Sequence, residues 1–320
     1  MTIGRRILAA IIAGGAVLIM ALPAAAASWS KVRDAVMVQR ERGNFAVAYS
    51  TAANYGGKNA DEIFDSQFLA GWIALRNLNR PDVAIKHFGQ MAQASAQVRG
   101  MRNASKAQAG YWLGRALTAA GKKKEAETIY RAAANYANTF YGQLAAAELG
   151  IGLHSSMIAG VAHHYPTKDF YWHDQRARKE LVLAIMREES NFRTRAVSNK
   201  GAQGLMQVMP GTAKMVGKNA GVNIDLRLLQ TNPDYNVAVG SKYLADQITR
   251  YRGNAMLAAA AYNAGPGNVD NWLRRFGDPR GGRVDPVDWV ESIPFGETRN
   301  YVKKVIGSYI TYMALAYNRK

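Results

Sequence analysis

A repeated helical pattern in the first half most limits what this chain can fold into. Across residues 28–152 alanine is abundant, Pro81 is the only proline, and strand signals are scarce. Two segments, 79–88 and 121–130, each begin with a turn, continue with an alanine and place an aromatic residue four positions later. A looser copy spans 43–49. The pattern predicts consecutive helical hairpins rather than a sheet.

The residue types in these copies have a packing logic. An alanine lets two helices approach closely, and the aromatic residue fills the gap to the next hairpin. Stacked units of roughly 34 residues or a little more are typical of solenoids. We therefore expect a tetratricopeptide-like solenoid over residues 28–152, with an irregular helical bundle as the alternative.

The rest of the chain predicts a second domain, because 320 residues exceed what one hydrophobic core usually serves. Residues 153–178 read as a connector, and residues 179–320 as a further helical domain. The overall fold class is therefore mainly α. Helices are expected at 179–189, 211–218, 235–251, 255–263 and 298–316, with a stop at 265–267 and a loop over 276–288.

The N-terminus resembles a secretory signal. Arg5 and Arg6 precede the apolar run Ile7–Leu22, and Pro23 and the small residues Ala24–Ala27 follow it. This is the order of charged, apolar and cleavage regions in a signal peptide. The run is shorter than the ~20 residues of a spanning helix. We expect residues 1–27 to be removed and the mature protein to be periplasmic, with a membrane anchor as the alternative.

Charge and histidine content narrow the classes of partner. The formal net charge of +18 is spread over both halves and favours a polyanion, such as nucleic acid or an anionic wall or membrane surface. The export signal argues against nucleic acid. Cysteine is absent, which excludes thiolate chemistry. The connector holds four of the five histidines, but their spacing matches no common zinc pattern, so we expect a polar hinge and no metal there. They are His154, His163, His164 and His173.

One glutamate is a candidate catalytic acid. On a helical wheel at 100° per residue, Glu189 falls on the apolar face of the helix that begins at Lys179, whereas Glu188 falls at its rim and faces water. A carboxyl that loses hydration at a helix C-terminus has a raised pKa. A neutral carboxylic acid is what general-acid cleavage of a glycosidic bond requires. The alternative is a helix cap or an ion pair with Arg193.

Four blocks in the second half resemble the soluble lytic transglycosylase family. They are Glu189-Ser190, Gly201-Ala202-Gln203-Gly204-Leu205-Met206-Gln207-Val208-Met209-Pro210, Ala261-Tyr262-Asn263-Ala264-Gly265-Pro266-Gly267, and Glu291-Ser292-Ile293-Pro294-Phe295-Gly296-Glu297-Thr298-Arg299-Asn300-Tyr301-Val302. Their order and spacing match the family over nearly all of residues 179–317. Residues 111–116 and 139–145 resemble the helical front of its larger members, which is shortened here.

The resemblance implies a fold and a set of site residues. The fold is a lysozyme-like domain of the goose type, and Glu189 corresponds to the catalytic glutamate. The positions lining or supporting the sugar groove are Ser198, Gln207, Met209, Tyr262, Asn263, Glu291 and Tyr301. Core packing is the alternative for Met209 and Tyr301, and an arginine partner is the alternative for Glu291. No metal or organic cofactor is implied.

One position departs from the family pattern, because Glu188 stands where glutamine is usual before the catalytic residue. It offers an alternative acid, and its charge would also raise the pKa of Glu189. The helical phase favours Glu189.

The activity implied is non-hydrolytic cleavage of peptidoglycan between N-acetylmuramic acid and N-acetylglucosamine, which gives 1,6-anhydromuropeptides. One glutamate acts as acid and then as base. Two alternatives stay open: a hydrolytic muramidase on the same fold, and a non-catalytic wall-binding or assembly factor. The expected partners are the glycan strands and, in the assembly reading, a protein bound by the helical front.

Overall fold

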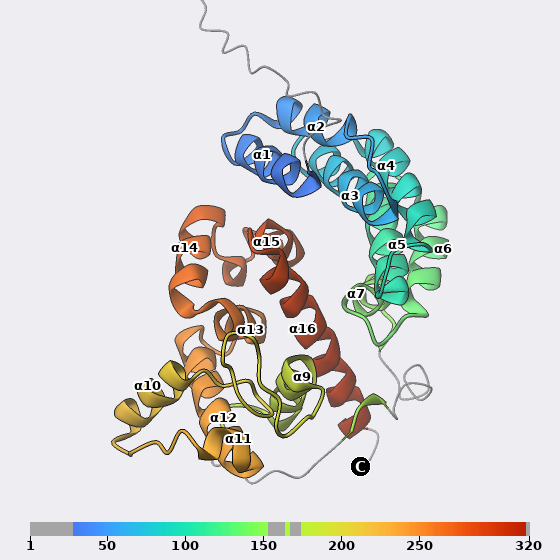
Figure 1. Cartoon of the computed structure of the whole chain (residues 1–320). Coiled ribbons are helices and arrows are strands. Elements are labelled where there is room, and N and C mark those ends of the chain that lie inside the picture. Colours follow the sequence, from blue (N-terminus) through green and yellow to red (C-terminus); the bar gives the residue numbers. More distant parts are fainter. Residues whose placement is uncertain (1–27, 153–163, 167–173, 318–320) are drawn as a thin grey trace, which may run out of the picture.

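The computed structural model describes residues 28–152, 164–166 and 174–317. Its first half is a row of helices in which consecutive members pack side by side (Figure 1). The expected signal segment 1–27 and three of the four connector histidines lie outside the described residues. The helices are α1 (Trp29–Glu41), α2 (Phe45–Ala53), α3 (Ala60–Arg76), α4 (Pro81–Ser95), α5 (Arg102–Ala119), α6 (Lys123–Ala134) and α7 (Phe140–Glu148).

The aromatic residues of the repeats pack within their own hairpins, and Phe88 also fills the gap to the next hairpin as expected. Phe88 on α4 lies against Gly71 of α3, where a Cβ would collide with its ring, and Tyr130 on α6 lies likewise against Gly114 of α5. Each aromatic therefore fills space within its own hairpin. Phe88 also stacks on Trp112 of the next hairpin, with ring centroids 5.9 Å apart, so the gap between hairpins is filled as well.

The second half is also helical, and within the described residues it contains two isolated bridges and no strand. The mainly α class is confirmed. The helices are α9 (Lys179–Ser190), α10 (Pro210–Ala220), α11 (Leu228–Thr231), α12 (Pro233–Arg250), α13 (Ala255–Ala264), α14 (Pro266–Phe276), α15 (Pro286–Ser292) and α16 (Gly296–Tyr317), with the 3-10 turn η2 (Pro279–Gly281). In the described ranges no helix has both the length and the apolar composition that a membrane span requires.

Three of these helices, the single turn α11 and the longer α14 and α15, were not expected. The Gly265-Pro266-Gly267 sequence does end α13, but Pro266 is also the first residue of α14. Proline suits that position because its nitrogen needs no intrahelical partner there. Val269 and Trp272 then bury one face of α14. Likewise, α15 begins inside the segment expected to be a loop, where Asp285 caps the backbone N–H groups of Val287 and Asp288.

The two halves meet at α15 through charged side chains. Asp288 accepts hydrogen bonds from the Trp72 indole at 2.8 Å and from Arg76 at 3.0 Å, both on α3. Arg76 also pairs with Asp285 at 2.6 Å. In addition, Val287 packs into the hydrophobic core of the front helices. The division into 28–152, 153–178 and 179–320 stays a prediction, and α15 is where the proposed domains would be joined.

The longest helix, α16, lies between the two halves (Figure 1). One side of it packs on α9 and α13, and another meets α7 of the front. Gln143 of α7 donates to the backbone oxygen of Gly307 at 2.9 Å and to the Thr311 hydroxyl at 3.1 Å. Residues on different faces of α16 therefore have different surroundings.

Candidate active site

Glu189 lies in the last turn of α9, which ends at Asn191 in a left-handed conformation with φ 48°. The helix is buried on more than one side, since every residue from Leu181 to Met186 is buried. The single apolar face of the wheel was therefore an incomplete description. Ser190 fixes this end of the helix, because its hydroxyl donates to the backbone oxygen of Leu205 at 2.8 Å.

The carboxyl of Glu189 is bonded to a buried tyrosine. The Tyr301 hydroxyl of α16 donates to Glu189 Oε1 at 2.7 Å, and Tyr301 is only 8% exposed. Tyr262 of α13 belongs to the same surroundings, since burial and then the negative charge of Glu189 raise the pKa of its phenol well above the usual value. Its hydroxyl donates to the Met206 oxygen at 2.9 Å.

Burial raises the pKa of Glu189 to about 7. The hydrogen bond from Tyr301 opposes this rise, while the charges of Glu297 and Glu188 add to it. In the described part of the chain no lysine or arginine forms an ion pair with Glu189, so no cation compensates the buried charge. A carboxyl in this state holds its proton near neutral pH and can donate it.

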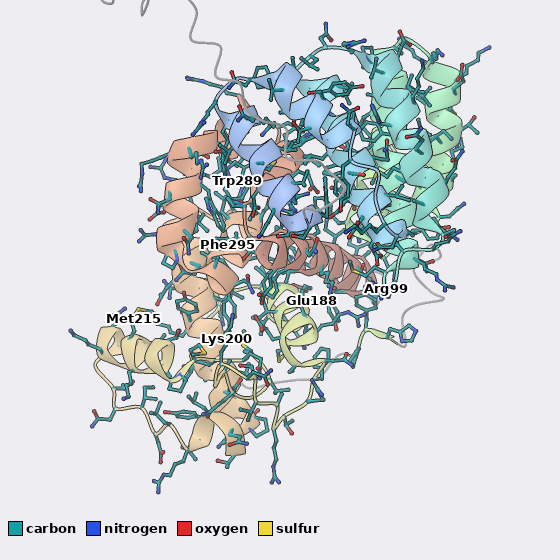
Figure 2. The ribbon with its side chains drawn as sticks, turned by 45° about the horizontal axis from the view of Figure 1, so that its top comes forward. Arg99, Glu188, Lys200, Met215, Trp289 and Phe295 are labelled. Carbon is teal, nitrogen blue, oxygen red and sulfur yellow. The ribbon has the colours of Figure 1, made fainter. Side chains whose placement is uncertain are left out.

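The neighbouring carboxylate, Glu188, does not face open water as expected. Its side chain is 17% exposed, it accepts a hydrogen bond from Ser308 of α16 at 3.1 Å, and Arg187 lies 3.7 Å away. Figure 2 shows it at the end of α9 that lies near α16. Glu188 thus has both a hydroxyl donor and a cation beside it, whereas Glu189 has a hydroxyl donor and no paired cation in the described residues.

The loop that follows Ser198 is folded back on itself. The Ser198 hydroxyl accepts from the Ala202 N–H at 3.0 Å, and its backbone N–H donates to the Ala202 oxygen at 2.9 Å. Gly204 has φ +74°, and a Cβ there would collide with the side chain of Asn236. The loop therefore requires glycine at position 204 for both its backbone angle and its space.

Asn236 is a supporting residue that the sequence analysis missed. It is fully buried on α12; its Oδ1 accepts from the Met206 N–H at 2.9 Å, and its Nδ2 donates to the oxygens of Gln203 at 2.7 Å and Leu229 at 2.8 Å. These bonds hold the loop beside Tyr262. The available signal was an asparagine next to the apolar positions of a helix, where a buried amide needs partners.

Gln207 and Met209 have different surroundings. Gln207 adopts φ 47°, and its side-chain nitrogen donates to the backbone oxygens of Ala196 at 3.0 Å and Gly204 at 2.8 Å. Its amide N–H groups are thus used inside the loop, which leaves Oε1 as the group for a ligand. Met209 precedes α10 and is 41% exposed, so core packing does not explain it.

Asn263 lies at the C-terminal end of α13 and contacts α16. Its Oδ1 accepts from the Thr298 hydroxyl at 2.6 Å, and Thr298 is buried. This bond orients the Asn263 amide in the residue next to Tyr262. Glu189, Tyr301 and Tyr262 together form what we call the Glu189 cluster. Asn263 directly follows Tyr262 in the sequence, and its side chain is held by α16, the helix that carries Tyr301.

Glu291 is a correction, because the structure places it away from Glu189. It is 1% exposed and bonded to Lys303 at 2.9 Å, to the hydroxyl of Tyr141 from α7, and to Arg299 at 3.7 Å. Lys303 follows Tyr301 by two residues, so the two side chains point to nearly opposite sides of α16. A sealed carboxylate in this position does not contact a sugar, and the expected alternative of a cationic partner describes it.

Comparison with known proteins gives a consistent result. The family model for the transglycosylase SLT domain matches residues 171–281. The soluble lytic murein transglycosylase of Salmonella typhimurium is 43% identical over 132 residues, which are 40% of this chain and 19% of the relative. The matched segment therefore spans about a fifth of the length of that relative.

Solved structures resemble the chain over most of its length. An inactive mutant of the lytic transglycosylase Slt from Pseudomonas aeruginosa aligns with TM-score 0.65 and 24% identity, covering 89% of this chain and 57% of that one. The 70-kDa soluble lytic transglycosylase from Escherichia coli aligns with TM-score 0.53 and 17% identity, covering 91% and 73%. At these identities the likeness concerns the fold, and it supports the predicted helical front followed by a lysozyme-like domain.

Proposed function

Because the C-terminal part of this chain belongs to the transglycosylase SLT family, we propose that the protein is a peptidoglycan lytic transglycosylase with Glu189 as its acid and base. The observation that carries the proposal is the state of Glu189: partly buried, without a paired cation in the described residues, bonded to Tyr301, and with a pKa of about 7. Such a group can lose a proton and take one back in the same cycle.

The proposed reaction begins with proton transfer. Glu189 protonates the oxygen that joins N-acetylmuramic acid to N-acetylglucosamine, and that bond breaks. The positive charge that develops at C1 is met by the oxygen of the substrate's own N-acetyl group. Glu189, now ionised, is stabilised by the Tyr301 hydroxyl, and it then accepts the proton of the C6 hydroxyl. Attack of that oxygen on C1 closes a 1,6-anhydro ring without consuming water.

The loop and α13 supply groups for the sugar in this proposal. Ser198, the oxygen of Gln207, and Asn263 are polar groups suited to N-acetyl and hydroxyl groups, while Tyr262 and the exposed Met209 offer apolar contact. Asn236 holds the loop in place without contacting the substrate. We infer that residues 1–27 direct the chain to the periplasm, where its substrate lies.

Glu297 raises the alternative of hydrolysis. It is exposed, and its charge affects Glu189, so a second carboxylate is near the acid. Glycosidases that use water generally need such a carboxylate to activate it. With Glu291 sealed on the other side of α16, Glu297 is the residue that a hydrolytic reading would invoke.

The nature of the new chain end separates the two reactions. We would digest purified wall in heavy-oxygen water and analyse the fragments by mass. The proposal predicts unlabelled 1,6-anhydro ends for the wild type and for Glu297→Gln. Label at reducing ends, lost in Glu297→Gln, would establish hydrolysis and leave Glu189 as the acid only.

A further inference from the structure

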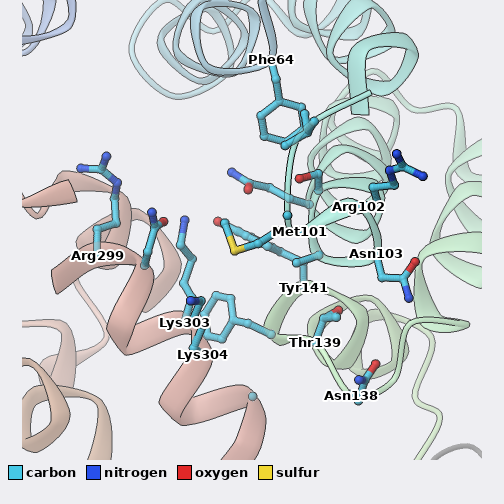
Figure 3. Close-up of a pocket in the computed structure, with 18 of the residues that line it drawn as sticks. Phe64, Met101, Arg102, Asn103, Asn138, Thr139, Tyr141, Arg299, Lys303 and Lys304 are labelled. Atoms are coloured by element: carbon cyan, nitrogen blue, oxygen red, sulfur yellow. The ribbon is translucent and has the colours of Figure 1, made fainter. Parts of the chain in front are cut away.

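A cavity of about 980 Å³ lies between the front helices and α16, on the side of α16 away from the Glu189 cluster. Its walls come from α1, α3, α5 and α7 on one side and from α9, α15 and α16 on the other. Figure 3 shows Arg299, Lys303 and Lys304 on α16 opposite Met101 and Arg102. Neither Glu189 nor Tyr301 belongs to the lining.

The lining carries a surplus of positive charge. Seven basic and four acidic side chains contribute to it. The basic residues are Arg33, Arg99, Arg102, Arg187, Arg299, Lys303 and Lys304, and the acidic residues are Asp61, Asp65, Glu188 and Glu291. The cavity is therefore suited to an anion that bears more than one charge.

The acidic residues of the lining already have partners. Asp61 pairs with Arg99 at 3.0 Å. Glu291 is shared by Lys303 and Arg299, and Glu188 lies beside Arg187. Asp65 accepts from the indole of Trp29 at 3.2 Å. Each of the four acidic side chains therefore has a partner, and together they pair with four of the seven cations and one indole.

Three cations in the cavity remain without an acidic partner: Arg33 of α1, Arg102 of α5 and Lys304 of α16. Within the described residues none of the three forms an ion pair or a side-chain hydrogen bond. Nη2 of Arg33 is moreover buried without a hydrogen-bond acceptor, an arrangement that costs free energy. Three helices thus each place an unpaired cation in the lining of one cavity. An anionic ligand in the cavity would give these cations a partner.

The rest of the lining favours a peptide over a simple ion. Phe64 and Met101 offer apolar surface, and Asn103 and Asn138 offer amide groups that can pair with a peptide backbone. Figure 3 shows these four side chains around the same space as Arg102 and Lys304. The site also lies between the proposed domains, where ligand sites are frequent.

We propose that this cavity binds the carboxylate-bearing stem peptides of peptidoglycan, which branch from the strand under cleavage or from a neighbouring one. This inference rests on the proposed function for the identity of the ligand. The sugar strand is held at Glu189 on one side of α16, and a stem peptide is received on the other. The front helices would then recognise the peptide part of the wall while the second half cleaves the glycan.

The test uses stem peptides freed from purified wall by an amidase, so that no sugar is present. Their binding to the full chain is measured by calorimetry at low and high salt. The variant Arg102→Gln/Lys304→Gln removes two exposed cations of the cavity. Two charge contacts at this exposure correspond to roughly tenfold weaker binding. The control Lys122→Gln/Lys214→Gln removes two exposed cations elsewhere and is expected to bind like the wild type.

Three outcomes would overturn the proposal: no binding to the wild type, equal binding by both double variants, or binding of a poly-glutamate peptide but not of stem peptides. The last would identify the occupant as an acidic protein segment. Wall digestion is measured separately on the same variants. A wild type that digests wall but binds no stem peptide refutes only the cavity, whereas a wild type that binds the peptide but cleaves no wall refutes only the proposed activity.

Discussion

Two glutamates on either side of α16, the partly buried Glu189 and the buried Glu291, have opposite properties. Glu189 faces Tyr301 without a cation, and burial raises its pKa to about 7. Burial also acts on Glu291, but Lys303, Arg299 and the Tyr141 hydroxyl outweigh it and hold the pKa of that carboxyl below its usual value. Burial alone therefore does not identify an acid; the presence or absence of nearby cations decides which carboxyl keeps its proton.

The comparison assigns different roles to the two regions. Around Glu291 the carboxylate is matched by two cations and a hydroxyl, which suits a junction that joins α15 and α16 to α7. Around Glu189 a negative charge is uncompensated, which costs stability but leaves a proton available for chemistry. If this assignment is right, substitutions near Glu291 should change stability and substitutions near Glu189 should change catalysis.

The largest expected effect concerns the acid itself. Glu189→Gln keeps the shape of the side chain but removes its proton chemistry, so wall digestion should fall by roughly 10² to 10⁴. Glu188→Gln should keep most of the activity, because that carboxylate is bonded to Ser308 and lies beside Arg187. The measurement is the release of soluble fragments from purified wall. The reverse ranking of the two variants would show that Glu188 is the acid.

Substitutions at the junction around Glu291 should lower the free energy of unfolding. Lys303→Met leaves Glu291 buried with Arg299 at 3.7 Å as its remaining cation. Removing one partner of a buried pair costs about 3–5 kcal/mol, which urea unfolding measures. The double variant Glu291→Met/Lys303→Met also removes the carboxylate but leaves the buried Arg299 without its partner, so it should recover part of the loss. If Lys303→Met unfolds like the wild type, the junction is not a coupled buried pair.

Tyr301 should affect rate and pH dependence together. Tyr301→Phe removes the donor that stabilises ionised Glu189, and a lost bond to a charged group corresponds to about a tenfold decrease in rate. The same bond lowers the pKa of Glu189. The fall of activity at high pH, which lies near pH 7 in the wild type, should therefore move to higher pH. A rate loss with an unchanged profile would mean that Tyr301 only packs against the site.

Glu297 should give the smallest effect, in the opposite direction. Its charge raises the pKa of Glu189, so Glu297→Gln should move the high-pH fall of activity to lower pH. The side chain is exposed, and solvent screens it, so most of the activity should remain. A severe loss of rate would indicate a direct role in the reaction.

The sequence predicted the parts of this site that depend on local pattern. Glu189 at the end of a helix, the tight turn at Gly204 and the closing helix that carries Tyr301 are examples. The candidate groove residues followed from the motif blocks that resemble the family. Among them, the exposed Met209 agrees with a contact role rather than core packing.

The position of Glu291 could not be predicted, because its partner Tyr141 is 150 residues earlier in the chain. No local pattern indicates that α7 docks on α16. The same reason explains Asn236, whose buried amide holds a loop more than 30 residues away. The helix α14 was missed for a different reason, since Gly-Pro-Gly was taken as a stop when its proline also begins the next helix.

The most direct test of the account is the titration of the two glutamates in the folded protein. Carbon-13 labelling of glutamate carboxyls, with Glu189→Gln and Glu291→Gln to assign the signals, follows each group by NMR. We predict that the signal lost in Glu189→Gln titrates near pH 7 and that the signal lost in Glu291→Gln stays ionised below the usual range of glutamate. A normal, low pKa for Glu189 would contradict its assignment as the acid.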